Sequence, residues 1–312
     1  MSPSQLQNVP ASVRQRLLNL ARRQGEDFQF VLTRFALERL LYRLSISGHG
    51  EQFLLKGAML FPVWAGGKRP TKDLDLAARS EISSDRISTI FRDLCMIQHP
   101  EDGLVFDPDS IEVGRIREIQ PEAEAGLRVQ MVATLAAARI PIQVDIGFGD
   151  AVTPGATNIE YPTLLDHPAP RLKAYSRETV VAEKFQAMVH FGIANSRLKD
   201  FYDLSLLAQS FDFSGPILSQ AIQATFQRRR TQVPAEDPIA LSPDFASDPG
   251  KQAAWKAFLR RIAKAQKAEN LPDLFDVCAL LRGFLMPPSR AIASGEPFND
   301  VWPASGPWRS SL

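Results

Sequence analysis

Two aspartates one residue apart, Asp73 and Asp75, are the residues whose type and spacing most directly suggest chemistry. They lie in the stretch TKDLDLAARS, where Leu74 and Leu76 alternate with them. The alternation predicts a β-strand with both carboxylates on one face, about 6–7 Å apart. Such neighbours repel each other, so either one carboxyl is protonated or a divalent cation neutralises both. An Asp-x-Asp pair at a strand edge is also often no more than a solvated face.

A third acid, Asp145, is the one charged residue in the apolar stretch IPIQVDIGFG, which is typical of a later strand. Mg²⁺ prefers oxygen ligands and usually accepts one or two protein carboxylates together with substrate phosphates. A third carboxylate on an adjacent strand would complete a two-metal arrangement for phosphoryl chemistry. We therefore expect one or two Mg²⁺ ions to be held by Asp73, Asp75 and Asp145, and Asp145 could instead accept the proton of an attacking hydroxyl.

Upstream of the aspartates, the stretch FLLKGAMLF contains a Lys-Gly step, Lys56 and Gly57, ahead of a short helical pattern. A turn that leads into a helix offers backbone N–H groups to phosphate. A basic loop with Lys68 and Arg69 then leads into the aspartate strand. Together these residues favour a site that binds a phosphorylated ligand beside the metal ligands.

The elements that must position these residues fall into two parts. Residues 11–44 show the spacing of two helices, and the strands that follow have few helices between them, which indicates an antiparallel or mixed sheet. After about residue 170 the patterns are helical. We therefore predict an α/β domain over 1–170 and a helical domain over 171–312. The tail from 287 onwards lacks periodicity and is expected to be loosely attached.

Composition excludes several classes of protein. The chain has 312 residues and a formal net charge of +1, so any nucleic-acid surface must be a local patch. It has neither an N-terminal apolar signal segment nor a run of about 18 apolar residues, so we expect a cytoplasmic protein without a membrane partner. Cys95 and Cys278 lie far apart and are expected to be buried thiols.

Three segments, taken in order, resemble the nucleotidyltransferase-fold AbiEii/AbiGii toxin family. FLLKGAMLF…GGKRPTKDLDL is similar to its first motif, IPIQVDIGFGD to its later strand, and ETVVAEKFQAMVHFGIANSRLKDFYDLSLL to its helical signature. The joint occurrence of the three is specific, whereas each alone is not. The positions that carry the resemblance are Lys56, Gly57, Arg69, Thr71, Asp73, Asp75, Asp145, Glu183, Lys184, Arg197, Lys199, Asp200 and Asp203.

The resemblance implies an α+β fold, with a polymerase-β-like nucleotidyltransferase core and a helical C-terminal domain. It implies a toxin of a toxin–antitoxin or phage-defence pair, with an antitoxin encoded by a neighbouring gene. Some members transfer a nucleotide from an NTP, and the 3′ end of tRNA is a known class of acceptor. One departure is the turn Gly57-Ala58-Met59, where the family usually has Gly-Gly-Thr or Gly-Ser, so no hydroxyl is offered to the triphosphate.

With the resemblance, Lys184 is expected to contact the triphosphate, although by pattern alone a lysine beside an apolar stripe more often extends its amine to solvent. Asp203, rather than Asp200, is the favoured base or orienting group. Lys56, Gly57, Arg69, Thr71, Lys199 and Asp200 are expected to help bind the nucleotide. Tyr202 could stack on a base, but partial burial is the commoner fate of tyrosine.

Basic residues gather in the helical half, at Arg228 to Arg230 and along KAFLRRIAKAQKA. They indicate either a solvated helix face or a groove for an RNA backbone. The leading hypothesis is a Mg²⁺-dependent nucleotidyltransferase toxin that acts on tRNA or another RNA. The alternatives are a phosphotransferase that moves the γ-phosphate and an effector that binds NTP without turnover.

Overall fold

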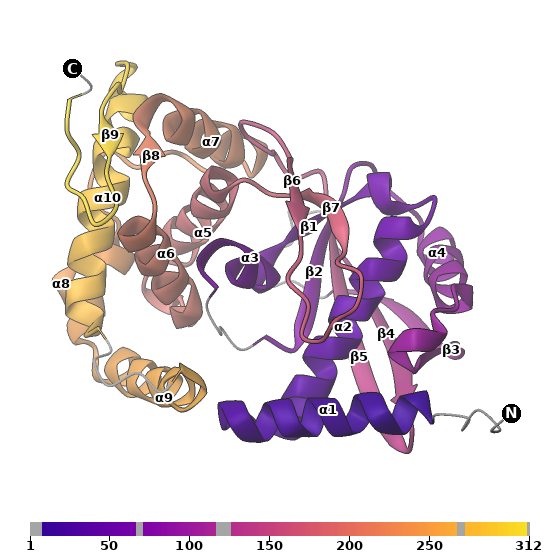
Figure 1. Cartoon of the computed structure of the whole chain (residues 1–312). Helices are drawn as coiled ribbons and strands as arrows, with labels where there is room; N and C mark the ends of the chain where they lie inside the picture. The colour runs from indigo at the N-terminus through magenta and orange to yellow at the C-terminus, as the bar shows by residue number, and fades with distance from the viewer. Residues whose placement is uncertain (1–7, 67–70, 117–125, 267–271, 311–312) are drawn as a thin grey trace, which may run out of the picture. The chain divides into compact units, whose positions relative to one another are not determined.

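The chain divides into two compact units in a computed structural model that describes residues 8–66, 71–116, 126–266 and 272–310 (Figure 1). Unit 1 comprises Met1–Gly149 and Asn158–Ala174, and unit 2 comprises Asp150–Thr157 and Tyr175–Leu312. The sequence placed a single boundary near residue 170. The structure instead assigns the short segment Asp150–Thr157 to the helical unit.

The described residues of unit 1 form a seven-stranded mixed sheet in the order β3-β4-β5-β2-β1-β7-β6. β2 pairs in parallel with β5, and β1 in parallel with β7, whereas β1–β2, β3–β4 and β4–β5 are antiparallel. This arrangement puts β1, β2, β5 and β4 side by side. The strands are β1 (Phe53–Lys56), β2 (Asp73–Ala78), β3 (Leu104–Arg115), β4 (Leu127–Leu135), β5 (Ala138–Phe148), β6 (Thr157–Glu160) and β7 (Arg171–Ala174).

The two faces of this sheet differ because side chains alternate along each strand. On β5, Ile140, Ile142, Val144 and Ile146 are buried, while the residues between them are partly or fully exposed. Helices cover the apolar face, as contacts of α2 with β5 and of α4 with β3 show. The helices of unit 1 are α1 (Val9–Gln24), α2 (Phe28–Ile46), α3 (Phe61–Ala65) and α4 (Ser84–Met96), with short 3₁₀ turns η1 (Gly50–Gln52), η2 (Gly57–Leu60) and η3 (Pro100–Asp102).

A buried ion cluster fixes α2 to η3. Asp102 accepts hydrogen bonds from Arg43 Nη1 over 2.7 Å and from Arg39 Nε over 3.2 Å, and all three side chains are almost fully buried. Burial of Asp102 acts to raise the pKa of its carboxyl, but the hydrogen bond and charge of Arg43 hold that pKa below its usual value. The cluster therefore anchors the helix that supports the apolar face of the sheet.

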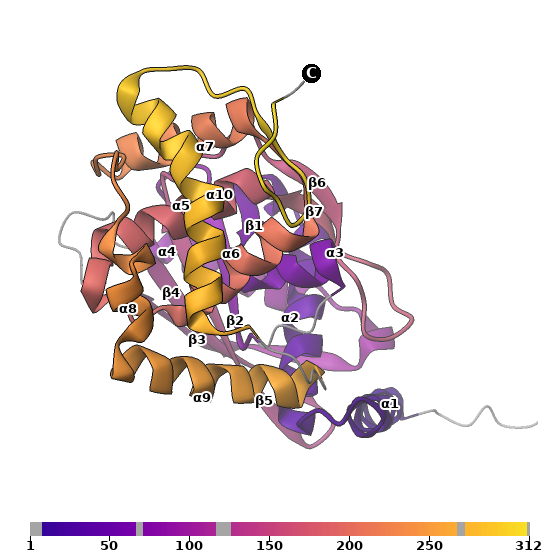
Figure 2. The ribbon, with the colours of Figure 1, turned by 90° about the vertical axis from the view of Figure 1, so that its left-hand side faces the viewer.

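Unit 2 is built from helices around an aromatic core. α5 contacts α7, and α10 contacts both α6 and α7, as the turned view in Figure 2 lets the reader follow. Phe185, Phe201, Phe226 and Phe284 are fully buried between them. The elements are α5 (Arg177–Phe191), η4 (Gly192–Ala194), α6 (Leu198–Ser210), β8 (Phe213–Ser214), α7 (Gly215–Arg228), η5 (Ile239–Leu241), α8 (Pro243–Ser247), α9 (Pro249–Gln266), α10 (Leu274–Ser294) and β9 (Val301–Trp302).

The C-terminal tail is firmly packed, so the prediction that it is loosely attached is wrong. β9 pairs with β8, and the indole N–H of Trp302 donates to the carbonyl oxygen of Ala208 over 2.7 Å. The indole of Trp308 stacks on Phe284 and donates to its carbonyl oxygen over 3.0 Å. Periodicity could not reveal this, because two tryptophans attach an irregular segment through long-range contacts.

The expected fold class is confirmed: an α+β core with a mixed sheet precedes a helical C-terminal part. No helix in the described residues is both long enough and apolar enough to cross a membrane.

Candidate active site

Strand β2 presents Asp73 and Asp75 on one face, as the alternating pattern predicted. Leu74 and Leu76 turn to the buried side, whereas Asp73 is exposed and Asp75 is partly exposed. The apolar pair anchors the strand in the core. Both carboxylates therefore lie on the polar face of the sheet at fixed positions.

The strand register extends this pair into a row of charged residues across four strands, which we call the sheet row. Asp75 on β2 lies opposite Lys56 on β1 and, on the other side, opposite Asp145 on β5. Asp145 in turn lies opposite Arg128 on β4. Residues in register share one face, and neighbouring strands are ~4.8 Å apart. The order across the sheet is therefore lysine, aspartate, aspartate, arginine.

Arg128 and Asp145 form a two-pronged ion pair at one end of the row. Nε of Arg128 donates to Oδ1 of Asp145 over 2.8 Å, and Nη2 donates to Oδ2 over 2.7 Å. The amide of Gln143 lies against the pair and, with its oxygen toward Arg128, accepts from both nitrogens at 3.2 Å. The hydrogen bond to Asp145, with the charges of Asp145, Asp73 and Asp75, raises the pKa of Arg128 despite partial burial.

Sequence reasoning missed Arg128. Its signal is the alternation of LRVQ, which puts the guanidinium on the same face as Gln130 and turns Leu127 and Val129 inward. That pattern shows a polar face, but it does not say which residue of β5 lies opposite. The register supplies the partner.

Gly57 lies directly under Asp75. Its φ of +71° is in the left-handed region, which favours glycine. A Cβ at this position would lie 2.0 Å from Oδ2 and 2.7 Å from Cγ of Asp75, so only glycine lets the carboxylate rest there. The two following residues, Ala58 and Met59, are buried in η2. The Lys-Gly step is thus part of the same site as the aspartates.

The remaining predicted residues of unit 1 lie at the start of β2. The hydroxyl of Thr71 donates to the carbonyl oxygen of Asp73 over 3.1 Å, which ties the entry of the strand to its first carboxylate. Arg69 lies outside the described residues, so its predicted role stays a prediction.

In unit 2, Lys184 lies between two aspartates in what we call the helix network. Its amine on α5 donates to Asp200 Oδ1 on α6 and, over 2.9 Å, to Asp203 Oδ2. Arg197 Nε also reaches Asp200 Oδ2, at 3.3 Å. The side chains of Asp200 and Asp203 are only 5% and 0% exposed, and that of Lys184 is 14% exposed.

Neighbouring cations keep Asp200 charged in the helix network. Burial of Asp200 acts to raise the pKa of its carboxyl, but the charges of Lys184 and Arg197 more than offset this and lower it. Lys199, which neighbours Asp200, is itself exposed. The network therefore links α5 to α6 and fixes the position of the Lys184 amine.

Two other residues of the helical signature, Tyr202 and Glu183, contact other side chains of unit 2. Tyr202 is buried and packs its ring against Trp255 and Phe258, which is the commoner of the two fates considered for it. Glu183 lies 3.2 Å from the guanidinium of Arg229, which also approaches Asp150 at 3.7 Å. Neither arrangement points to contact with a substrate.

The predicted site residues thus fall into two groups, each described within its own unit. Unit 1 brings together Lys56, Gly57, Asp75 and Asp145, with Asp73 one pleat away on the same face. Unit 2 brings together Lys184, Asp200 and Asp203.

The oxygen donors of the sheet row suit a divalent cation, because Mg²⁺ accepts one or two protein carboxylates. Within the described ranges, however, no group of three or more His, Cys, Asp or Glu residues is arranged to hold a metal ion. Arg128 engages both oxygens of Asp145, the third carboxylate of the predicted metal site. The donor chemistry fits, whereas the third carboxylate is held by an internal cation.

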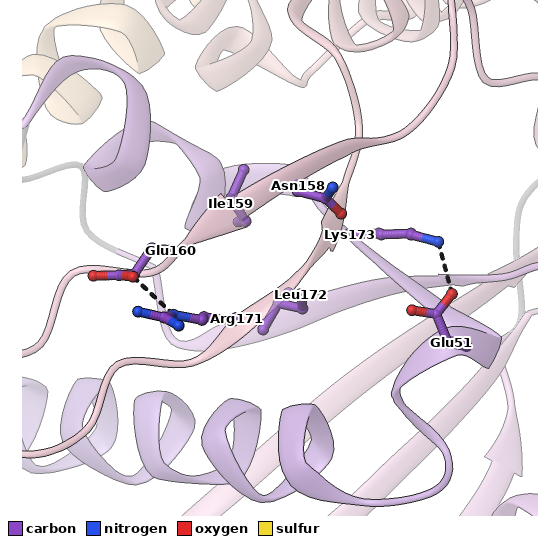
Figure 3. Close-up of a pocket in the computed structure, with 7 residues that line it drawn as sticks. All are labelled: Glu51, Asn158, Ile159, Glu160, Arg171, Leu172 and Lys173. Atoms are coloured by element: carbon purple, nitrogen blue, oxygen red, sulfur yellow. Dashed lines mark hydrogen bonds and ion pairs between the residues drawn. The ribbon is translucent and has the colours of Figure 1, made fainter.

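A pocket of about 370 Å³ lies at a different place in unit 1, along β6, β7 and η1 (Figure 3). Two ion pairs cross it: Arg171 with Glu160 at 2.9 Å, and Lys173 with Glu51 at 2.7 Å. Asn158, Ile159 and Leu172 complete its lining. Its charged groups neutralise one another, so the pocket presents no net charge for a phosphorylated ligand.

Basic side chains are exposed on α9 of unit 2, at Lys256, Arg260 and Arg261. Arg228 and Arg230 are also exposed, at the end of α7. The predicted members Lys264 and Lys267 lie where side chains are not described. Lys251, by contrast, donates to the carbonyl oxygen of Asn195 and lies over the ring of Phe245.

Comparisons with known proteins identify a family and two solved structures that resemble this chain. The sequence matches the model of one family, described as the nucleotidyl transferase AbiEii toxin of type IV toxin–antitoxin systems, over residues 39–277. JHP933 from Helicobacter pylori is 14% identical, with a TM-score of 0.49 over 86% of this chain and 98% of that one. A candidate nucleotidyltransferase from H. pylori is 13% identical, with a TM-score of 0.47 over 86% and 96%.

A search of curated protein sequences returned no significant match. The family match does not depend on the two solved structures, because it spans well over half of the chain. The matched range contains Asp75, Asp145 and Lys184. Type IV toxin–antitoxin systems pair a toxin with an antitoxin, so the match also implies an antitoxin partner. The chain belongs to the AbiEii nucleotidyl transferase toxin family.

Proposed function

We propose that this toxin transfers a nucleotide from an NTP to the hydroxyl of an RNA in the cytoplasm, with the 3′ end of tRNA as the first acceptor to test. The observation that carries the proposal is the sheet row, in which Asp75 and Asp145 lie in register on neighbouring strands of one polar face. Two adjacent carboxylates beside a tight glycine turn are suited to a metal-bound triphosphate.

Asp73, Asp75 and Asp145 would hold one or two Mg²⁺ ions, which when bound supply charge neutralisation to the triphosphate. In the reaction, the acceptor oxygen forms a bond to the α-phosphorus, the bond from that phosphorus to the bridging oxygen breaks, and pyrophosphate leaves. Asp145 takes up the proton of the attacking hydroxyl. Lys56, Gly57 and Thr71 lie around Asp73 and Asp75 and orient the nucleotide.

Lys184 is proposed separately as a ligand of the triphosphate. A lysine amine is a compact charge suited to phosphate, and two buried aspartates fix its position within unit 2. Asp203 orients it, and Asp200 and Lys199 contribute to the charge around it. Binding of a labelled NTP to Lys184→Arg tests this role, because a loss of affinity with an intact fold supports it and unchanged affinity contradicts it.

The exposed basic side chains of α9 and of the end of α7 are the support for an RNA acceptor. Lysine and arginine on a helix surface bind phosphates without reading sequence, so binding should weaken steeply as the salt concentration rises.

The test is incubation of the purified protein with Mg²⁺, total tRNA and each of the four α-labelled NTPs, beside the Asp75→Ala variant. We expect label in RNA from the intact protein and none from the variant. The labelled nucleotide then identifies the donor. Absence of label in RNA and in protein with all four nucleotides, from a protein shown to be folded, would contradict nucleotide transfer.

One observation favours a second candidate function. The residues after Gly57 are Ala58 and Met59, both buried, so this turn offers no hydroxyl to a triphosphate. A protein of this fold that binds NTP without turnover would be an effector, and one that transfers the γ-phosphate would be a phosphotransferase. The same reactions with γ-labelled NTP separate the two, because only the phosphotransferase moves that label to an acceptor.

A further inference from the structure

Arg128 occupies the carboxylate that the proposed metal site needs as its third ligand. Its two nitrogens engage both oxygens of Asp145 at 2.8 and 2.7 Å. It also feels the charges of Asp73 and Asp75, which act to raise its pKa. The guanidinium is thus a cation already placed in a field of three carboxylates.

The partial exposure of the Arg128–Asp145 pair allows another cation to replace Arg128 at Asp145. The side chain of Arg128 is 40% exposed and that of Asp145 is 22% exposed. Water reaches both groups, so Arg128 can leave Asp145 without stranding a buried charge. In the helix network, by comparison, Asp203 is fully buried, and loss of Lys184 would remove a cation from a carboxylate that water does not reach.

We propose that Arg128 is a positioning residue that competes with the divalent cation for Asp145. This inference rests on the proposed function, since it takes the sheet row as the metal site. A cation seated on Asp145 lies next to the guanidinium charge, and like charges at that distance repel strongly. Arg128 therefore holds Asp145 in place in the metal-free protein, lowers its affinity for the metal, and withdraws when the metal binds.

Direct competition for Asp145 and a purely electrostatic effect of the charge at position 128 predict different results. Only direct competition depends on the shape of the side chain that carries the charge. A lysine at position 128 keeps the positive charge but lacks the planar fork that engages both carboxylate oxygens. If only the field mattered, Arg128→Lys would bind metal as the wild type does. Under competition by contact, Arg128→Lys binds metal more tightly than the wild type, and Arg128→Gln binds it more tightly still.

The experiment measures Mn²⁺ binding to the full-length protein by electron paramagnetic resonance of free Mn²⁺, without nucleotide. The variants are Arg128→Gln, Arg128→Lys and, as a matched control, Arg139→Gln, which removes an exposed arginine from β5 of the same unit. We expect Arg128→Gln to lower the Mn²⁺ dissociation constant roughly two- to fivefold, the range expected for loss of a partly exposed charged pair. Arg139→Gln should leave it unchanged.

Equal affinity of the wild type and Arg128→Gln, or weaker binding by the variant, overturns the proposal. Weaker binding would mean that Arg128 holds Asp145 in the geometry that the metal needs. Arg128→Lys keeps the test decisive if Arg128→Gln fails to fold. The Asp75→Asn substitution, introduced into the wild type and into each variant, tests the competition and the metal site separately. If the wild type and Arg128→Gln bind Mn²⁺ equally and Asp75→Asn abolishes that binding, only the competition by Arg128 is refuted. If Asp75→Asn changes Mn²⁺ binding in none of the proteins, the metal site of the proposed function is refuted as well.

Discussion

The sheet row of unit 1 and the helix network of unit 2 use the same residue types in different surroundings. In the sheet row, the carboxylate of Asp145 is 22% exposed, and the arginine that pairs with it is 40% exposed. In the helix network, both carboxylates are at most 5% exposed. The members are Lys56, Asp75, Asp145 and Arg128 in the first and Lys184, Asp200, Asp203 and Arg197 in the second.

The difference in burial separates two uses of ion pairs. A pair that water reaches contributes little to stability, but its partners can exchange for a metal ion or a phosphate. A buried pair cannot exchange cheaply, because removal of either partner leaves a charge without solvation. The sheet row is therefore suited to chemistry, and the helix network is suited to fixing one lysine in one place.

The largest effect on stability is expected when the cation of the helix network is removed. Lys184→Met removes the cation that two buried carboxylates share, so we expect a loss of about 3–5 kcal/mol in the free energy of unfolding. Urea denaturation followed by circular dichroism measures it. Lys199→Met, which changes an exposed lysine of the same region, should cost less than about 0.5 kcal/mol. Equal costs for the two variants would show that the network does not stabilise unit 2.

A smaller effect is expected from two glycines of unit 1 that share a left-handed backbone. At Gly57 a methyl group would collide with Asp75, whereas at Gly66, with φ +59°, no atom of the described residues beyond its chain neighbours lies within 4 Å of the added carbon. Gly66→Ala should cost only the backbone penalty of about 1–2 kcal/mol. Gly57→Ala should cost more than this and should abolish nucleotide transfer, because Asp75 is displaced. Thermal melts and the transfer assay on both variants check this, and equal behaviour would contradict the close packing of Asp75 on Gly57.

We also expect the contribution of the helix network to stability to depend on pH. The pKa of Asp200 is lowered in the folded state, so its contribution is fully present above the unfolded value of about 3.9 and is lost as the pH falls through the folded value. Below pH ~4, the wild type should therefore lose stability more steeply than Asp200→Asn. Denaturation curves between pH 2.5 and 6 measure the difference, and parallel acid limbs would contradict it.

The smallest effect on stability is expected in the sheet row. Arg128→Gln breaks a pair whose members are both partly exposed, so the free energy of unfolding should fall by at most about 1 kcal/mol. A loss as large as that of Lys184→Met would remove the distinction between the two regions.

Much of the sheet row could be predicted from sequence, because alternation of Leu74 and Leu76 with the aspartates determines which face they occupy. The partner of Asp145 could not. Its register with Arg128 depends on the β4–β5 hairpin, whose connection is Ala136-Ala137, with φ +52° at Ala136. Tight hairpin turns normally signal themselves by glycine or asparagine, and alanines give no such signal.

The resemblance singled out Lys184, Asp200 and Asp203, but neither their contact with one another nor their burial was predicted. Asp200 and Asp203, three residues apart, read equally well as a solvated face with Lys199 as a surface partner. The structure instead turns both toward Lys184 on the preceding helix. Tertiary packing of α5 against α6 decides which lysine is the partner, and no local spacing encodes that choice.

The role of the sheet row in the reaction is tested by measuring nucleotide transfer by Asp75→Asn on the same sample as its free energy of unfolding. Asp109→Asn, which changes an exposed acid of unit 1, is the matched control. We expect Asp75→Asn to lose transfer by at least about a thousandfold while its stability stays within about 1 kcal/mol of the wild type. The control should keep both. Transfer at the wild-type rate by Asp75→Asn would contradict the assignment of the sheet row as the reactive site.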